Sequence, residues 1–282
     1  MDNSGIRISA DSTCDLSPEL IRRYNIAITP LQVVVEGHSY RDGEEIDPDR
    51  LFQMVDKTGK VGSTTAVNYE EYHRFFTQRL QDADAVIHFT ISSDMSSCFQ
   101  NARTAGDELK NVYVVDSRNL STGIGQLALD AAVMAREGAS GAEIFERMER
   151  QKEKLNVSFV IDTLEYLHKG GRCSGVAALG ANLLRLKPMI EVTGGLMGVG
   201  KKYRGSLEKS VLSYVTERIG DGSGADLRRV FITDSGVSDE LAESVREILS
   251  GVGFREILRT PTGGTIACHC GPGTLGILYY NQ

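Results

Sequence analysis

The sequence lacks the features that would carry it into or across a membrane. No run approaches the about 18 apolar residues that mark a membrane span, and the opening Met1-Asp2-Asn3-Ser4 lacks the basic and apolar regions of a signal peptide. Hydrophobic residues make up 41% and charged residues 24% of the 282 positions, the balance of a globular protein. We therefore expect a cytoplasmic protein without an integral membrane segment.

Basic charge and paired cysteines are also scarce. The formal net charge is −7, whereas nucleic-acid binding usually needs a basic surface that displaces counterions from phosphates. The cysteines form an odd, scattered set without a CxxC motif, as expected in a reducing compartment: Cys14, Cys98, Cys173, Cys268 and Cys270. Cys268 and Cys270 flank a histidine but have no second cluster to complete a tetrahedral metal site. The sequence thus predicts no nucleic-acid partner, disulfide, metal site or cofactor.

The order of short apolar and longer amphipathic runs predicts an α/β fold. In the first half these runs alternate as in βα units, with a largely parallel sheet flanked by helices. A charged helix is expected over 141–155, and a new strand pattern begins at Val157. Two later strands, 188–192 and 196–203, are expected to form a hairpin across Gly194-Gly195. We predict two α/β domains, residues 1–156 and 157–282, the second with a mixed sheet and helices.

Three predicted strands of the first half end in hydroxyl-rich loops. Strand 6–10 runs into Asp11-Ser12-Thr13, strand 85–91 runs into 92–97, and strand 112–115 ends at Asp116-Ser117. Ligands of open parallel sheets lie beyond the carboxyl ends of the strands, and helix N-termini there favour anions. The alternative, that each hydroxyl only caps its helix, stays open for each residue taken singly.

Familiar catalytic and nucleotide-binding motifs are missing. The chain has no Walker loop, no GxSxG elbow, no HExxH and no dinucleotide GxGxxG after the first strand. Four polar clusters remain: 62–65, 92–97, Gly170-Gly171-Arg172 and the segment 269–273. A lone histidine is more often structural than functional, but Gly271-Pro272-Gly273 would fix a tight loop and hold the His269 ring near an anion.

The residues of these segments, and their order along the chain, resemble the sequence motifs of the DegV family. The residues that carry the resemblance span nearly the whole chain: Asp11-Ser12-Thr13-Cys14-Asp15-Leu16, Tyr40-Arg41-Asp42-Gly43, Ile91-Ser92-Ser93, Val115-Asp116-Ser117, Asp162-Thr163-Leu164-Glu165-Tyr166-Leu167, Gly170-Gly171-Arg172 and His269-Cys270-Gly271-Pro272-Gly273. Members of this family bind a long-chain fatty acid between two α/β domains. The resemblance therefore implies a non-enzymatic, bacterial lipid carrier with a ligand tunnel near the domain interface.

The resemblance also implies the residues of the site. The carboxylate would be bound by hydroxyls and by the histidine that lies beside the head group: Ser63, Thr64, Ser96, Ser97 and His269. Arg172 would contact the head group or a partner, and Arg204 would dock a partner, although a surface salt bridge or a solvated charge remains the alternative for each. This chain differs from the residues that are usual in the family at Thr65, Ser97, Cys98 and Cys270. The apolar run 176–186, with Met189 and Ile190, would line the tunnel or belong to the core.

The function that the resemblance implies involves a second protein. A separate fatty acid kinase would phosphorylate the bound carboxylate with ATP, and the acyl phosphate would enter phospholipid synthesis. Two alternatives stay open at this point. One is a stand-alone hydrolase or acyltransferase that uses a serine with His269, against which the sequence shows no strained serine elbow and no carboxylate placed to orient the histidine. The other is a lipid-sensing regulatory protein.

Overall fold

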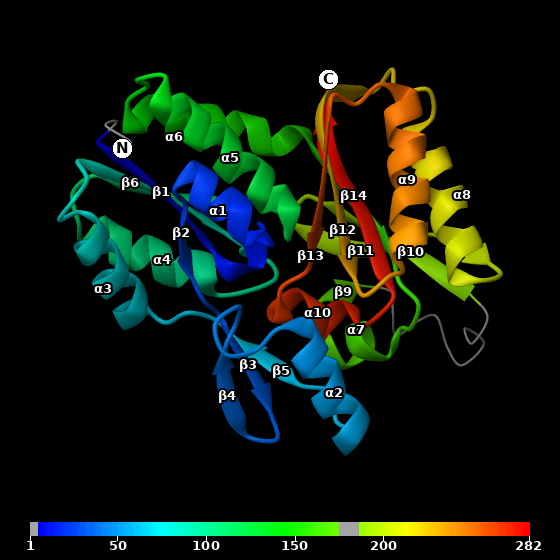
Figure 1. The fold of residues 1–282 in the computed structure, drawn as a ribbon. Helices are drawn as coiled ribbons and strands as arrows, with labels where there is room; N and C mark the ends of the chain where they lie inside the picture. The colour runs from blue at the N-terminus through cyan, green and yellow to red at the C-terminus, as the bar shows by residue number, and fades with distance from the viewer. Residues whose placement is uncertain (1–4, 175–185) are drawn as a thin grey trace.

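The protein is described by a computed structural model that covers residues 5–174 and 186–282. The described residues form three β-sheets with helices packed around them, and the three sheets meet near helix α10 (Gly264–Cys270) (Figure 1). The predicted α/β fold, with a parallel sheet in the first half and a mixed sheet in the second, is confirmed. No helix within the described ranges is long and apolar enough to cross a membrane.

The first sheet is parallel and has the order β2-β1-β6-β7. Its strands are β1 (Ile6–Asp11), β2 (Ala27–Thr29), β6 (Ala85–Thr90) and β7 (Val112–Asp116). Helices α5 (Thr122–Arg136) and α6 (Gly141–Gln151) cover one face, and α3 (Tyr69–Arg79) and α4 (Cys98–Asp107) cover the other (Figure 1). Short connections complete this part: η1 (Ser12–Cys14), α1 (Pro18–Tyr24) and η2 (Lys152–Lys154).

The second sheet is mixed and has the order β13-β12-β14-β8-β10-β11-β9. Its strands are β8 (Leu155–Val160), β9 (Cys173–Ser174), β10 (Leu186–Thr193), β11 (Leu196–Arg204), β12 (Ala225–Ser235), β13 (Glu256–Pro261) and β14 (Thr274–Asn281). Helices α8 (Leu207–Ile219) and α9 (Asp239–Val252) cover its outer face (Figure 1). Helix α5 packs against β8 and β14 as well as β1 and β6, so it is buried on most sides. One hydrophobic core therefore runs across both large sheets.

A third, antiparallel sheet was not expected from the sequence. It has the order β4-β3-β5, with β3 (Gln32–Val35), β4 (His38–Arg41) and β5 (Ser63–Thr65), and it forms a lobe with α2 (Pro48–Thr58) at the bottom of Figure 1. Strands of three or four residues are too short to show a clear alternation of polar and apolar side chains. Helices α7 (Glu165–Gly170) and α10 lie where this lobe meets the rest of the chain.

Two predictions concern regions that the structure leaves undecided. The apolar run 176–186, proposed as part of a tunnel, lies outside the described residues except for Leu186, which begins β10. The division into domains at residue 156 stays a prediction, and β8 begins one residue before it at Leu155.

The predicted hairpin is confirmed, because β10 and β11 pair across Gly194 and Gly195. Both glycines have positive φ, as a tight two-residue hairpin turn requires.

Candidate functional site

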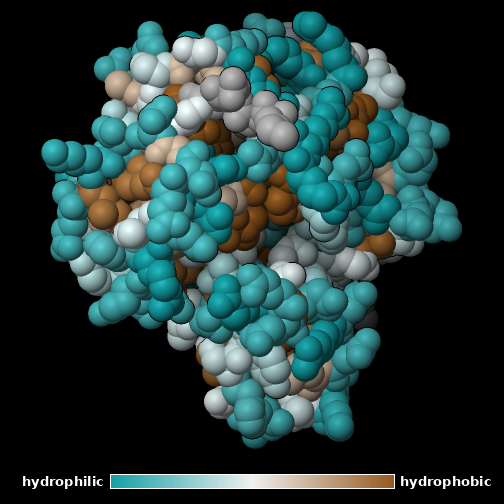
Figure 2. Space-filling model, turned by 60° about the vertical axis from the view of Figure 1, so that its left-hand side comes forward, coloured by the Kyte–Doolittle hydropathy of each residue, from teal (hydrophilic) through white to brown (hydrophobic). Residues whose placement is uncertain are grey.

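A cavity of about 320 Å³, the central cavity, lies at the meeting point of the three sheets. Loops after β6 and β7, strand β5, helix α10 and the start of β11 all contribute to its wall. Its apolar lining includes Leu31, Ile91, Met95, Leu120, Met197 and Ile266, and its polar lining is Thr64, Thr65, Ser96, Ser97, Arg172, Thr265 and His269. In Figure 2 hydrophobic atoms gather in a hollow above the lower lobe. A largely apolar cavity with few converging polar groups is typical of a small-molecule site.

Thr64 and His269 form the polar centre of this cavity. Thr64 Oγ1 lies 2.8 Å from His269 Nε2, although 205 positions separate the two residues in the chain. His269 Nδ1 is buried and has no hydrogen-bond partner among the described residues. Burial, and second the positive charge of Arg172, lower the pKa of His269 to about 4. The imidazole is therefore neutral at pH 7 and can act as a donor to Thr64 when Nε2 carries its proton.

Arg172 lies at the exposed side of this pair. Its guanidinium donates to Gly170 O at 2.6 Å, and its charge adds to the effect of burial in lowering the pKa of His269. Gly170 approaches the imidazole so closely that a Cβ there would lie 2.4 Å from His269 Nδ1. Glycine at position 170 thus leaves the space that the ring occupies. Arg172 supplies a positive charge at the cavity wall that an anionic ligand would meet.

Helix α10, which carries His269, begins against two buried carboxylates. Asp15 Oδ1 accepts the N–H of Gly263 at 2.8 Å, and Asp42 Oδ1 accepts the N–H of Gly264 at 2.7 Å. These acceptors satisfy N–H groups that a helix start leaves without partners. Burial, opposed in part by hydrogen bonds from Ser121 and Gly263, raises the pKa of Asp15 well above its usual range. The DSTCDL and YRDG segments therefore act on the site through the helix, without lining the central cavity.

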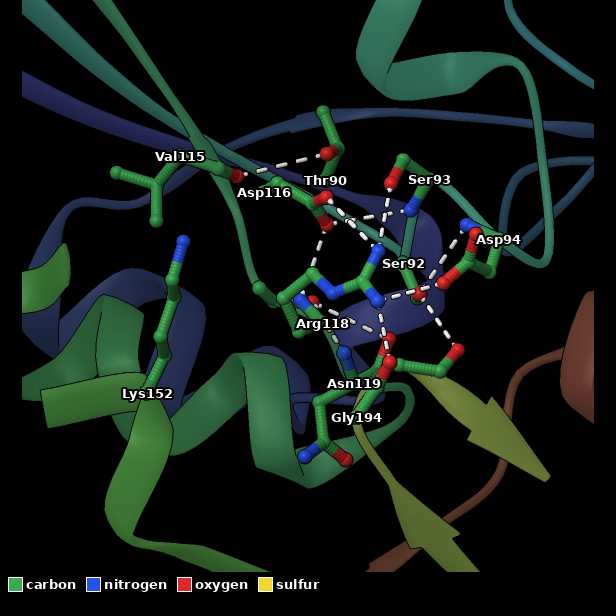
Figure 3. Close-up of polar contacts among 12 residues, drawn as sticks. Thr90, Ser92, Ser93, Asp94, Val115, Asp116, Arg118, Asn119, Lys152 and Gly194 are labelled. Atoms are coloured by element: carbon green, nitrogen blue, oxygen red, sulfur yellow. Dashed lines mark hydrogen bonds and ion pairs between the residues drawn. The ribbon is translucent and has the colours of Figure 1, made fainter. Parts of the chain in front are cut away.

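The turn of the β10–β11 hairpin is bound to the loops that follow β6 and β7 (Figure 3). Arg118 forms an ion pair with Asp94 at 2.6 Å and donates to Gly194 O. Ser92 Oγ donates to Gly195 O at 2.7 Å. Arg118 itself has a φ of 52°, a left-handed conformation that a non-glycine residue adopts only at some cost. These contacts hold the hairpin in place at the point where Met197 enters the cavity wall.

The structure brings five of the predicted site residues around the central cavity and leaves two outside it. Thr64, Ser96, Ser97, Arg172 and His269 all line it. Ser96 Oγ also accepts the N–H of Cys98 at 3.3 Å, at the start of α4, so it combines a capping contact with a place in the wall. His269 lies in the last turn of α10, and the Gly-Pro-Gly loop that was expected to hold it begins only after the helix.

Ser63 and Arg204 are the two residues that the structure places elsewhere. Ser63 is exposed and does not line the central cavity, whereas the next two residues of β5, Thr64 and Thr65, both line it. Arg204 is exposed at the end of β11, seven residues beyond Met197. At the usual strand rise this is roughly 23 Å from the cavity wall. The position of Ser63 does not support a role in binding a carboxylate in this cavity.

Sequence reasoning missed Thr265, which lies one helical turn before His269 on α10. Its side chain is buried and lines the central cavity, and its Oγ1 has no hydrogen-bond partner among the described residues. The spacing of four between positions 265 and 269 would have indicated a shared helix face, had the helix been predicted.

A small second pocket, the inner pocket, lies next to the central cavity on the side of the second sheet. This inner pocket has a volume of about 20 Å³ and shares Leu120, Ile266 and Cys270 with the central cavity. Phe159, Gly276 and Leu278 form its far wall, on the face of the second sheet opposite α8 and α9. The central cavity, which holds the polar pair Thr64 and His269, is thus bordered by buried apolar side chains on this side.

Comparisons with known proteins agree with this geometry. The family model for uncharacterised proteins of the DegV family matches residues 5–282. The chain belongs to the DegV family. A DegV domain-containing protein of Deinococcus radiodurans is 32% identical over 275 residues, which cover 96% of this chain and 97% of the relative. Protein DegV of Bacillus subtilis is 28% identical over 278 residues, which cover 97% of this chain and 98% of the relative.

Solved structures of DegV proteins share the fold over the full length. A DegV family protein from Thermus thermophilus, whose structure is described as showing fatty acid binding, matches with a TM-score of 0.90 and 33% identity over 98% of this chain and 99% of that one. DegV from Bacillus subtilis, described as a fatty acid binding protein, matches with a TM-score of 0.86 and 26% identity over 98% of this chain and 99% of that one.

Proposed function

We propose that this chain binds one long-chain fatty acid and presents its carboxylate to a separate kinase. The carboxylate lies in the central cavity beside Thr64, Ser96, Ser97 and His269, and the acyl tail runs along the apolar part of the cavity wall. Membership of the DegV family and the fatty acid binding described for the proteins from Thermus thermophilus and Bacillus subtilis support this assignment. The observation that carries it is the half-buried Thr64–His269 pair inside a mostly apolar cavity.

This pair suits a carboxylate because it offers a donor without adding a buried charge. When His269 Nε2 donates to Thr64 Oγ1, the hydroxyl proton of Thr64 is free to donate to a carboxylate oxygen. Ser97 offers a further hydroxyl donor at the cavity wall, and Ser96 would have to exchange its hydrogen bond to Cys98 Sγ for one to the carboxylate. Hydrogen bonds to a charged acceptor are about twice as strong as neutral ones, and the exposed Arg172 adds a positive charge nearby. The neutral imidazole avoids an unpaired buried cation.

The acyl tail supplies most of the binding free energy. Each methylene transferred from water contributes about 0.8 kcal/mol, so a tail of about 14 methylenes contributes on the order of 11 kcal/mol before entropy losses. The central cavity offers apolar wall for the tail at Ile91, Met95 and Ile266. In this scheme tail burial sets the affinity, and the hydroxyls fix the orientation of the head group.

We further propose that a fatty acid kinase phosphorylates the bound carboxylate, which the exposed position of Arg172 at the cavity wall supports. The kinase brings ATP and its metal ion, and the acyl phosphate product passes to phospholipid synthesis in the cytoplasm. Arg172, exposed beside His269, is suited to meet the added negative charge. Arg204, remote from the cavity and exposed, is suited to contact the kinase. The carrier itself needs no cofactor in this scheme.

The geometry favours this function over a stand-alone hydrolase or acyltransferase. A serine nucleophile needs a histidine within hydrogen-bond reach and a third group that orients that histidine. Here the hydroxyl partner of His269 Nε2 is Thr64, and Nδ1 has no hydrogen-bond partner among residues 5–174 and 186–282. Ser96 Oγ instead donates to Cys98 Sγ at 3.2 Å.

The proposal is tested first by identifying what the purified protein carries. Native mass spectrometry of the complex and denaturing mass spectrometry of the released molecules should find one long-chain fatty acid per chain. Adding a fatty acid kinase and ATP should then give acyl phosphate only when both proteins are present. A delipidated protein that takes up no fatty acid would overturn the carrier function. Binding without phosphorylation by any fatty acid kinase tested would overturn the kinase step alone.

A further inference from the structure

A hollow that faces solvent, the basic hollow, lies at one end of the second sheet. Its volume is about 380 Å³, and its wall comes from α6, η2, the start of β12, the residue before β13 and the end of β14. These segments meet in the upper part of Figure 1, whereas α10 lies in the lower half. The basic hollow shares no lining residue with the central cavity, so the proposed fatty acid site does not account for it.

Four cationic side chains line the basic hollow, and all four are exposed: Arg147, Lys154, Arg228 and Arg255. The one acidic side chain among the lining residues is Asp226, which forms an ion pair with Arg228 at 2.8 Å. Within the described part of the chain the other three cations form no ion pair, either with an acidic side chain or with the carboxylate at Gln282, which also lines the hollow. The protein therefore neutralises only part of the positive charge gathered there.

Ordinary surface effects account for only part of this arrangement. The dipole of a helix favours cations at its C-terminus, which accounts for Lys154 just beyond α6. Arg228 and Arg255 come instead from β12 and from the segment between α9 and β13. The chain has 38 acidic and 31 basic side chains, so an even scatter would place fewer cations than carboxylates in any one hollow. Cations held close together repel one another, and a bound anion would offset that repulsion.

The lining also indicates what kind of anion fits. Guanidinium groups bind phosphate oxygens through paired hydrogen bonds, and a lysine adds a point charge on a flexible stem. A phosphate monoester carries a charge of about −1.5 to −2 and three acceptor oxygens, which suits three arginines and a lysine better than a single carboxylate would. The side-chain amides of Gln151 and Asn281 also line the hollow. The hollow is as large as small-molecule sites commonly are, so it has room for more than one phosphate group.

We infer that the basic hollow binds a phosphate group, which belongs either to a free compound such as pyrophosphate or to the head group of an anionic lipid. This site is independent of the proposed fatty acid function, because the hollow lies apart from Thr64 and His269. It gives a chain of net negative charge one local surface that attracts phosphate.

The test compares two double variants that remove the same charge. R147A/R255A removes two of the cations of the hollow that form no ion pair. K57A/K202A is the matched control, because Lys57 and Lys202 are also exposed and form no ion pair among the described residues, but they do not line the hollow. Calorimetry at low salt measures the binding of pyrophosphate and of citrate. Co-sedimentation measures binding to phosphatidylcholine vesicles with and without phosphatidate.

Wild type and K57A/K202A should bind pyrophosphate or the phosphatidate vesicles, and R147A/R255A should bind them at least about tenfold more weakly, since it loses hydrogen bonds to a charged group. Pyrophosphate binding without vesicle binding assigns the hollow to free phosphate compounds, and vesicle binding assigns it to a lipid head group. Citrate binding as tight as that of pyrophosphate, no binding of either phosphate probe, or an equal loss in both double variants would overturn the inference.

Both double variants should fold, because all four substituted side chains are exposed, and thermal melts check this. Fatty acid binding should be the same in wild type and in both variants. A wild-type protein that binds phosphate but no fatty acid would count against the proposed fatty acid function and leave the basic hollow as a phosphate site.

Discussion

Gly170 offers a sharp test of the head-group geometry, because its Cα faces the His269 ring. A Cβ added there would lie 2.4 Å from His269 Nδ1, whereas an ordinary contact is about 3.4 Å or more. The ring would have to move by about 1 Å toward or past Thr64 Oγ1, which already lies 2.8 Å from Nε2. G170A should therefore disturb the Thr64–His269 pair without removing any polar atom.

The expected effect follows from the cost of overpacking, which is about 1–3 kcal/mol. If half of that cost falls on the ligand-bound geometry, the Kd for a fatty acid rises about twofold to tenfold, since 1.4 kcal/mol corresponds to a factor of ten. Ligand affinity is measured by competition with a fluorescent fatty acid, and the His269 resonances by NMR. G251A is the matched control, because Gly251 also lies in a helix and a Cβ there meets nothing within 4 Å. Unchanged affinity and unchanged His269 resonances in G170A would refute this reasoning.

Three further outcomes are expected. T64V should weaken fatty acid binding at least about tenfold, since it removes a hydrogen bond to a charged group, while S63A on the opposite face of β5 should bind as wild type does; equal losses would contradict the register assigned to this strand. His269 has a pKa of about 4 when folded and near 6.5 when unfolded, so the unfolded chain binds more protons between these values and stability falls as pH drops through this window. H269Q should lose that part of the pH dependence in thermal melts from pH 7 to pH 5, and parallel curves would contradict the assignment. R118A should lower the melting temperature and speed hydrogen exchange in the hairpin turn, while R103A, which removes an exposed pair, should change neither.

The parts of the fold that the sequence predicted are those with a strong local pattern. Strands β1, β6 and β7 are short apolar runs followed by turn residues, and each lies within a residue or so of its predicted bounds. The hairpin at Gly194-Gly195 followed from turn chemistry alone, since few residues other than glycine accept positive φ at both positions. Local patterns of this kind do not depend on distant contacts, and so they could be recognised without a structure.

The parts that the sequence did not predict depend on distant contacts. Helix α10 is short and rich in small residues, and the carboxylates that bond to its first N–H groups come from positions 15 and 42. The sequence around position 264 therefore does not predict that these two carboxylates accept the first N–H groups of the helix. Likewise, Ser63 and Thr64 are chemically similar, and only the pairing of β5 with β3 decides which of them faces the cavity. The family resemblance pointed to segments that line the central cavity, but it did not separate Thr64, which lines it, from Ser63, which does not.

The contacts of α10 with Asp15 and Asp42 also bear on when the site forms during folding. They join residues separated by 248 and 222 positions, and contacts of such separation are formed late because long loops must close first. During synthesis the first sheet can assemble while the segment with His269 has yet to emerge. The proposed site at Thr64 and His269 therefore forms only after these distant segments have come together, and a ligand that binds there would stabilise their contact.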